Sequence, residues 1–344
     1  MFGIYIALAV LLILGILLLI FRISRLVNVV KGTGVKTSES SNNINGVLMI
    51  VFMVLFFGLA GWYSWAYFDD YTPPIASEHG VLTDKLFWRT MWITGIVFVV
   101  TNILLFWFSY KYRYNKNNKA LFYPHNNNLE ILWTGVPAIV LTWLVISGFM
   151  AWDGIMSEAP EESEQIEIMG YQYAWSIRYG GMDNQVGEYD YRLIDATNDH
   201  GVDFSDRSSF DDFKSNNLVI PKGKPILLKI RAKDVLHSVF IPHMRLKMDA
   251  VPGLPTQFWF VANKTTEEMR VEEDNPDFTY ELACTEICGR GHFSMKKNVI
   301  VLEQDEYDEW KADQASWLSK NPEYMSQVPN DLKELAMVTS GINK

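Results

Sequence analysis

The stretch Leu228-Lys229-Ile230-Arg231-Ala232-Lys233 alternates apolar and basic side chains one residue at a time. Successive side chains of a β-strand point to opposite faces of a sheet, whereas a helix repeats every 3.6 residues. Leu228, Ile230 and Ala232 are therefore predicted to face a core, and the three basic side chains to face away from it. This pattern places the second half of the chain in a β-sheet domain.

Five further stretches have the short apolar or alternating pattern of half-buried strands, and turns rich in proline and glycine separate some of them. An antiparallel sandwich or barrel fits this arrangement best. The predicted strands cover residues 166–168, 257–261, 269–271, 278–284 and 298–302, and the turns cover residues 221–225 and 251–255.

Residues 181–213 interrupt the strand pattern with nine acidic and two basic side chains. A segment of this charge is predicted to be a surface insertion that is too polar to build core. A helix is predicted from residue 307 onward, and residues 313–344 are expected to form a C-terminal tail. The β-domain therefore covers residues 153–312, with the acidic insertion inside it.

Four apolar segments come before this domain, and each is close to the ~20 residues that a helix needs to cross a bilayer. We predict four transmembrane helices, the first being a retained anchor because Arg22 and Arg25 follow it and no basic residue precedes it. The spans are at about 2–21, 46–68, 91–110 and 131–152, which gives one membrane unit over 1–68 and a helical hairpin over 69–152.

The loops differ in charge, and basic residues are retained on the cytoplasmic side of a membrane. The loops after the first and third spans are basic, with Lys36 and Lys116 among their charges, whereas the loop between spans two and three contains Asp69, Asp70 and Glu78. Both ends of the chain and everything after residue 152 are therefore predicted to lie outside the cytoplasm.

The net charge of −10 is also unevenly divided, because the chain carries +4 up to Ala151 and −14 beyond it. This balance excludes the basic surface of a nucleic-acid-binding protein and suits a cationic protein partner. The chain has only two cysteines and no Cys-x-x-Cys-His sequence, so it does not attach a c-type haem covalently.

The richest chemistry lies in Cys284-Thr285-Glu286-Ile287-Cys288-Gly289-Arg290-Gly291-His292-Phe293-Ser294-Met295, with His237 upstream. Two thiols, two imidazoles and a thioether suit copper better than calcium or magnesium, which prefer oxygen ligands. Two alternatives are a disulfide between the cysteines and a Cys2His2 zinc site, which has no use for Met295. Copper is favoured.

This run resembles the Cys-x-Glu-x-Cys-Gly-x-x-His-x-x-Met signature of cytochrome c oxidase subunit II. Three other stretches resemble that family in the same order: 129–137 is similar to the start of its second helix, 170–175 to its aromatic strand, and 247–253 to its Lys-x-Asp-Ala-x-Pro-Gly turn. The resemblance implies an α-helical transmembrane part followed by an all-β, cupredoxin-like Greek-key barrel. The two helices within residues 1–68 are additions to the family's hairpin.

The resemblance also implies a dinuclear copper centre of the CuA type. Its two cysteines would bridge both copper ions, a histidine would cap each ion, and a thioether and a backbone carbonyl would be weak ligands. The residues are Cys284 and Cys288, His237 and His292, Met295, and Glu286, whose side chain would also reach a magnesium ion at the boundary with the catalytic subunit.

By this resemblance, the chain is an electron-transfer subunit of a proton-translocating oxidase in a bacterial inner membrane, with the oxygen chemistry in subunit I. Electrons would come from cytochrome c, or from a cytochrome c domain of a neighbouring complex, near Tyr173 and Trp175. Tyr173 stands where the family usually has tryptophan. Glu130 would begin the proton path, although an acid at the mouth of a span is often only an interfacial anchor.

Three other functions deserve comparison with this one. A membrane-tethered copper or zinc carrier would give no role to Glu130 or to the turn at Asp249. A quinol oxidase subunit would lack the copper ligands, which are intact here. A nitrous oxide reductase would need a large additional catalytic domain and no membrane hairpin.

Overall fold

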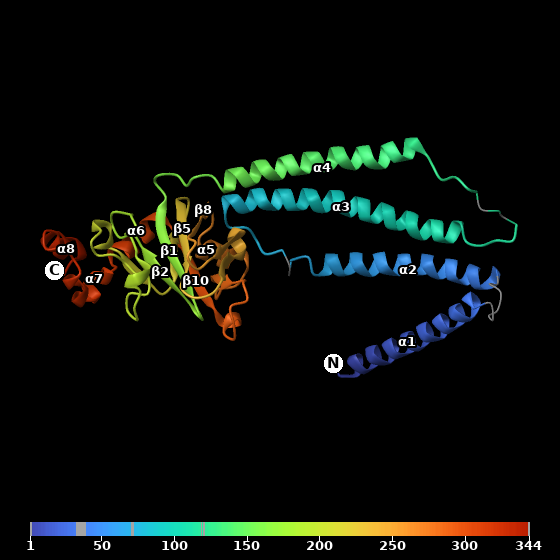
Figure 1. Cartoon of the computed structure of the whole chain (residues 1–344), viewed down its shortest axis with the longest axis horizontal. Coiled ribbons are helices and arrows are strands. Elements are labelled where there is room, and N and C mark those ends of the chain that lie inside the picture. The colour runs from blue at the N-terminus through green and yellow to red at the C-terminus, as the bar shows by residue number, and fades with distance from the viewer. Residues whose placement is uncertain (1, 32–38, 70–71, 118, 120, 343–344) are drawn as a thin grey trace. The chain divides into compact units, whose positions relative to one another are not determined.

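Figure 1 shows the computed structural model of the chain, which describes residues 2–31, 39–69, 72–117, 119 and 121–342. Lys36 and Asp70, which contribute to the comparison of loop charges, lie outside the described residues. The chain forms two compact units. One consists of Met1–Phe68 and Trp92–Glu130, and the other of Asp69–Met91 and Ile131–Lys344.

Four long helices have the length and composition to cross a membrane, as predicted. No more than 6% of the most apolar window of each is buried within the chain, so these apolar surfaces require lipid or other proteins around them. The helices are α1 (Phe2–Val30), α2 (Glu39–Ala66), α3 (Glu78–Lys111) and α4 (Asn127–Ile155).

Within the first unit, α2 packs against the second half of α3 through aromatic rings and one polar contact. The rings of Phe52 and Phe106 lie 5.5 Å apart, and the Arg113 Nε donates a hydrogen bond to the Asn43 Oδ1 at 2.7 Å. Gly46 allows this approach, because a Cβ at that position would lie 2.9 Å from the Arg113 side chain. The additional helix α2 is therefore attached to α3 through its first half.

The second unit contains a β-domain of two five-stranded sheets, with strand orders β3-β2-β1-β5-β8 and β4-β10-β9-β6-β7. The strands are β1 (Glu164–Tyr171), β2 (Ala174–Tyr179), β3 (Phe213–Ser215), β4 (Leu218–Pro221), β5 (Pro225–Ala232), β6 (His237–Ile241), β7 (Leu246–Ala250), β8 (Thr256–Val261), β9 (Tyr280–Cys284) and β10 (Lys296–Leu302). The shorter helices are α5 (Thr266–Glu272), α6 (Gln304–Ala312), α7 (Trp317–Lys320) and α8 (Lys333–Ser340).

The predicted cupredoxin-like all-β domain is confirmed, but the expectation of a purely antiparallel arrangement is wrong for two strand pairs. β1 pairs with β5 in parallel, with Ile166 opposite Leu228, and β10 pairs with β4 in parallel. Parallel pairing needs a long crossover between the strands. The chain between β2 and β5 provides one, because it contains the insertion and two further strands.

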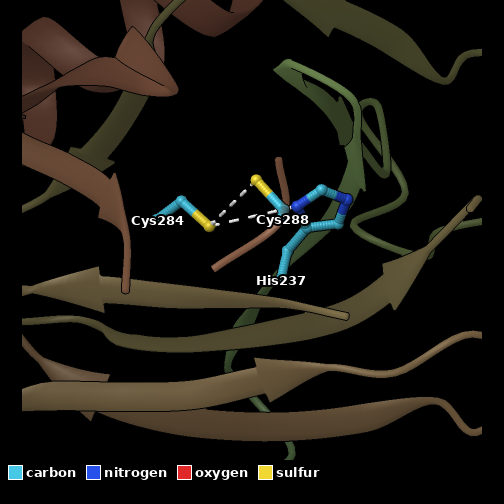
Figure 2. A group of neighbouring side chains, drawn as sticks. All are labelled: His237, Cys284 and Cys288. Carbon is cyan, nitrogen blue, oxygen red and sulfur yellow. Dashed lines mark hydrogen bonds between the residues drawn. The ribbon is translucent and has the colours of Figure 1, made fainter. Parts of the chain in front are cut away.

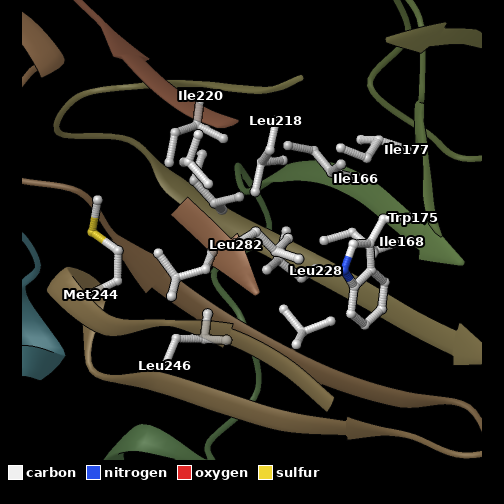
Figure 3. Packing of buried hydrophobic residues seen from close by; sticks show 14 of the residues in the cluster. Ile166, Ile168, Trp175, Ile177, Leu218, Ile220, Leu228, Met244, Leu246 and Leu282 are labelled. Atoms are coloured by element: carbon white, nitrogen blue, oxygen red, sulfur yellow. The ribbon is translucent and has the colours of Figure 1, made fainter. Parts of the chain in front are cut away.

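Apolar side chains from both sheets fill the space between them (Figure 3). Leu228 and Ile230 are fully buried, as the alternation predicted, and they pack with Leu218 and Leu282 of the opposite sheet. Arg231 is also buried, because the outer face of this sheet is covered. A strand pattern alone shows which face is apolar, and it does not show that a polar face is buried.

Two local predictions are wrong. Residues 269–271 lie in α5 and not in a strand, because Thr265 caps the helix and forms a reciprocal capping box with Glu268. The alternating pattern predicts one strand from Leu228 to Leu236 with His237 at its end, but that strand ends at Ala232, and His237 begins the next strand, β6.

The insertion is also not the coreless surface segment that its charge suggests. Val202, Phe204 and Phe210 are buried in a second apolar cluster. The other members of the cluster come from the C-terminal segment, which folds as α7, α8 and a 3-10 helix (Pro322–Ser326). These partners are Trp317, Leu318, Tyr324, Val328 and Ala336. Apolar residues that are separate in the sequence thus gather around a shared centre, which a count of charges does not reveal.

The acidic side chains of the insertion contribute to a buried ionic cluster on the outer face of β1, β2 and β5. Arg178 donates hydrogen bonds to Glu167 and Asp212, each at 2.7 Å, and Arg231 pairs with Glu167. His200, fully buried, contacts Glu167 through its Nδ1 at 2.7 Å. The Glu167 carboxylate therefore pairs with both arginines, whereas burial raises the pKa of Asp212 to about 8 against the opposing charge of Arg178.

Within this cluster, burial alone would raise the pKa of Glu167, but the charges of Arg178, His200 and Arg231 hold it well below its ordinary value. Burial lowers the pKa of His200, and its contact with Glu167 opposes this shift. Glu167 is thus ionised in the folded protein. A lowered carboxyl pKa stabilises the fold above the ordinary value of 4.5, and this stabilisation is lost as the pH falls below it.

Replacing Glu167 with glutamine leaves two buried arginines undercompensated and is expected to lower the free energy of unfolding by about 3 kcal/mol or more at pH 7. Urea unfolding of the detergent-solubilised chain, followed by near-ultraviolet circular dichroism, measures this loss. The difference between the two proteins should shrink as the pH falls below 4.5. Glu281→Gln is the control, because its pair with Lys296 is about half exposed and is worth less than about 1 kcal/mol. A difference independent of pH would contradict the assigned charge.

Candidate metal centre

Strand pairing brings the widely separated soft ligands together at one end of the β-domain (Figure 2). β6 and β9 are antiparallel neighbours, with Val239 opposite Cys284. His237 lies two residues before Val239, so its side chain points to the same face as that of Cys284. Cys288, His292 and Met295 follow in the connection between β9 and β10.

The ligand atoms lie at distances that suit a shared metal site. The Cys284 Sγ is 4.0 Å from the Cys288 Sγ and 3.9 Å from the His237 Nδ1. The Cys288 Sγ is 3.7 Å from the His292 Nδ1 and 3.9 Å from the Met295 Sδ. The backbone carbonyl of Glu286 is 3.2 Å from the Cys284 Sγ. All six predicted metal-site residues are therefore in one place.

The two cysteines are free thiols in this structure, so the alternative of a disulfide between them is not realised. Two sulfurs bound to one metal ion at ~2.3 Å with a tetrahedral angle lie about 3.8 Å apart. The observed separation of 4.0 Å matches that spacing. The residues present thus fit a thiophilic metal with respect to both donor type and distance.

The site is shielded from water. His237 and Met295 are fully buried, and Cys284 and Cys288 are buried as well. Burial, together with the neighbouring Cys284 sulfur, raises the pKa of the Cys288 thiol to about 11. Because the thiolate is the form that binds metals, binding at neutral pH must release protons.

Two residues that the sequence did not reveal support the ligands. The Asp234 Oδ1 lies 2.9 Å from the His237 Nε2, which leaves the Nδ1 of that ring facing Cys284. The Gln172 Nε2 donates a hydrogen bond to the Cys288 carbonyl. A carboxylate on the second ring nitrogen is a common partner of a metal-binding histidine. The spacing of Asp234 three residues before His237 is the signal that could have identified it.

Tyr173 and Trp175 lie directly beside this site. Trp175 is buried, its ring centroid is 5.9 Å from that of His237, and its Nε1 donates to the Met295 carbonyl at 3.3 Å. Tyr173 is 39% exposed, and its hydroxyl accepts a hydrogen bond from the Arg290 backbone. Tyr173 also covers Gly291, where a Cβ would come within 2.4 Å of its ring. The tyrosine is thus the partly exposed layer over the metal-binding loop.

Two predicted carboxyl groups, those of Glu286 and Glu130, lie away from the ligand atoms. The Glu286 side chain is exposed, although its carbonyl faces Cys284. Glu130 is exposed in the first turn of α4, and it belongs to the unit that contains the first two helices.

A β-sandwich with two buried cysteines, two histidines and a methionine at one end, following membrane-spanning helices, defines a membrane-anchored domain for a soft metal. Comparison with known proteins identifies the family to which this metal-binding domain belongs. Residues 165–304 match the family described as "Cytochrome C oxidase subunit II, periplasmic domain", and residues 60–150 match "Cytochrome C oxidase subunit II, transmembrane domain". The chain belongs to the cytochrome c oxidase subunit II family.

Two relatives agree with this assignment by sequence. The chain is 31% identical over 247 residues to the "Alternative cytochrome c oxidase subunit 2" of Bradyrhizobium diazoefficiens, covering 71% of this chain and 84% of that protein. It is 27% identical over 267 residues to the "Cytochrome c oxidase subunit 2" of Thermostichus vulcanus, covering 70% and 77%. The crystal structure of the periplasmic domain of subunit II (CoxB) of Bradyrhizobium japonicum is 25% identical, with a TM-score of 0.31, and covers 45% of this chain and 95% of that one.

The chain is therefore a membrane protein with a periplasmic domain, and it is part of a haem-copper terminal oxidase, an oxidoreductase. The periplasmic domain is the copper-binding domain of the family, and the cluster of His237, Cys284 and Cys288 lies within the matched segment. Helix α1 and most of α2 lie outside both matched segments.

Replacing Asp234 with asparagine is expected to weaken copper binding by about 10- to 100-fold, because His237 loses the carboxylate that orients its ring. Competition with a copper chelator measures the affinity. Glu286→Gln is the matched control, since it changes an exposed side chain and keeps the carbonyl next to Cys284. Equal affinities for the two variants would show that Asp234 has no supporting role.

Proposed function

We propose that this chain accepts electrons from a cytochrome c type donor at a dinuclear copper centre and passes them to the haem of subunit I. One observation carries the proposal: the ligands divide into two sets around two sulfurs. His237 and the Glu286 carbonyl lie beside Cys284, whereas His292 and Met295 lie beside Cys288.

This division favours two metal ions over one. His237, Cys284 and Cys288 have donor atoms within 4.8 Å of one another, and His292 stands outside that mutual set. A single tetrahedral zinc ion would need all four donors to converge on one point. Two imidazoles beside different sulfurs instead support two copper ions, which His237 and Cys284 on one side and His292 and Cys288 on the other would hold.

Copper held by Cys284, Cys288, His237 and His292 would supply one-electron transfer. The protein's own contribution is rigidity and exclusion of water. Trp175 packs on His237, Gln172 holds the Cys288 carbonyl, and the buried sulfurs have little access to solvent. Such burial also counts against a carrier that must exchange its metal.

Tyr173 supports an assignment of the region where electrons enter. It is partly exposed, and its hydroxyl hydrogen bonds to the backbone two residues after Cys288. Trp175 lies on the buried side of the same site. A donor that docks over Tyr173 would therefore have a short covalent and hydrogen-bonded path to a bridging sulfur. The charge of −14 beyond Ala151 favours a cationic donor.

We further propose that both termini lie on the periplasmic side of a bacterial inner membrane, as the loop charges predict. Glu130, at the cytoplasmic mouth of α4, would begin a proton path into subunit I. The exposed Glu286 side chain would be available to a magnesium ion at the boundary with that subunit. The contacts expected are with subunit I, other oxidase subunits and lipid.

The purified oxidase is expected to contain two copper ions for each copy of this chain, in addition to the copper at the haem-copper centre of subunit I, and to show an electron-spin signal split by two equivalent copper nuclei. Cys288→Ser should abolish both, because a hydroxyl oxygen is a poor ligand for a soft metal. Metal analysis and electron paramagnetic resonance measure the outcome. One spectroscopically silent zinc ion for each chain would refute the proposal.

Glu130→Gln is expected to slow oxygen consumption several-fold and to leave the copper spectrum unchanged, because the amide cannot carry a proton. Oxygen uptake by the purified oxidase measures turnover. Glu39→Gln on α2 is a control that also removes an acidic side chain from the first turn of a membrane-spanning helix. Unchanged turnover in the Glu130 variant would leave this residue as an interfacial anchor.

A further inference from the structure

A second polar junction lies at the opposite end of the strand that starts with His237. We name residues 73–84, which lead into and begin α3, the anchor segment. The Ala76 N–H donates to the His243 carbonyl at 2.8 Å, and the Ser77 hydroxyl donates to the Met244 carbonyl at 2.7 Å. The anchor segment is thus hydrogen bonded to the turn between β6 and β7.

Arg245 ends this turn in an unusual conformation. Its φ of 52° and ψ of 30° place it in the left-handed region, which glycine adopts freely and which a residue with a Cβ disfavours. Its guanidinium makes four hydrogen bonds: to both carboxylate oxygens of Asp84 at 2.8 and 3.0 Å, to the Pro73 carbonyl at 2.7 Å and to the Pro242 carbonyl at 2.8 Å. Three of the four reach the anchor segment, so the side chain that strains the turn also ties it to α3.

The ion pair is better placed than an ordinary surface pair. The Arg245 and Asp84 side chains are 18% and 20% exposed, and their contact is bidentate. Such charge-assisted, two-point contacts fix orientation as well as distance. Trp259 adds a second tie, because its Nε1 donates to the Ser157 carbonyl just beyond α4 and its ring lies 4.4 Å from that of His79 in α3.

The hairpin of β6 and β7 connects this junction to the metal centre. It is paired over its whole length, from His237 opposite Ala250 to Ile241 opposite Leu246. One end therefore holds a metal ligand, and the other end holds Arg245. A paired five-residue strand leaves little freedom between the two ends.

We propose that Arg245 is a positioning residue, which with Asp84 fixes the metal-bearing hairpin to the start of α3 and so sets the placement of the centre over its electron acceptor. This inference rests on the proposed function, because the group that is positioned is the proposed copper centre. A reacting site must be held within a fraction of an ångström by its supporting contacts. That requirement explains why position 245 holds an arginine, although its left-handed backbone conformation would favour glycine.

The test compares the whole oxidase carrying Arg245→Gly, Asp84→Asn, or the exchanged pair Arg245→Asp with Asp84→Arg. Glu272→Gln is the matched control, because it breaks the partly exposed pair between Glu272, the last residue of α5, and Lys264, which precedes that helix. Two quantities are measured: amide hydrogen exchange over residues 76–84, and the rate of electron transfer from copper to haem after photochemical injection. The copper absorption spectrum is recorded for every variant.

Arg245→Gly and Asp84→Asn are each expected to speed amide exchange in the anchor segment about tenfold, because the junction opens more easily. Both should slow electron transfer to haem about tenfold with an unchanged copper spectrum. The exchanged pair should recover part of both losses, and Glu272→Gln should change neither quantity. Asp84→Asn keeps the turn sequence intact, so it decides the matter if the glycine variant does not assemble.

Unchanged amide hydrogen exchange in the two single variants would show that Arg245 and Asp84 do not hold the anchor segment, and it would overturn the proposal whatever the copper content. Faster exchange with an unchanged rate of electron transfer would show a structural tie that positions nothing, and would also overturn the proposal. The absence of a copper signal from the unsubstituted oxidase would instead refute the proposed function.

Discussion

The pairing of β6 with β9 is the interaction on which the site depends. These strands come from distant parts of the chain, and only the register that sets Val239 opposite Cys284 places the His237 imidazole beside a cysteine sulfur. The local spacing of Cys284, Cys288, His292 and Met295 supplies the other ligands without tertiary structure. The site thus joins a compact local motif to one long-range contact, and the apolar core between the sheets holds that contact in register.

Sequence patterns predicted the parts of this protein that follow from periodicity or local spacing. The four membrane helices, the burial of Leu228 and Ile230, and the closeness of Cys284 to Cys288 are of this kind. The partners of polar groups were not predictable. The burial of Arg231 depends on Glu167, which lies 64 residues away, and the support of His237 depends on which way Asp234 points. Residues 269–271 form part of a helix although their sequence alternates like a strand. The Thr265 and Glu268 side chains hydrogen bond to free backbone N–H groups at the start of this helix, and this capping favours the helix over a strand.

The membrane part shows how a family hairpin acquires more helices. The match to the family begins at residue 60, yet α2 is attached to α3 by the Phe52 and Phe106 rings and by the bond from Arg113 to Asn43. Arg113 also contacts the Tyr110 ring, with its guanidinium carbon 4.3 Å from the centroid. An added helix of this kind extends the existing bundle, and its outward faces become new surface for lipid or neighbouring subunits.

The shared apolar cluster of the insertion and the C-terminal helices has a consequence for how such a chain can change over time. Phe204 stacks on Trp317 at 5.3 Å, so each segment supplies the covering that the other lacks. Loss of the C-terminal helices alone would leave aromatic rings of the insertion facing water, and loss of the insertion alone would do the same to the helices. The two segments are far apart in the sequence, but each covers the apolar side chains of the other, so a deletion of either one would have to include both to leave no exposed aromatic cluster.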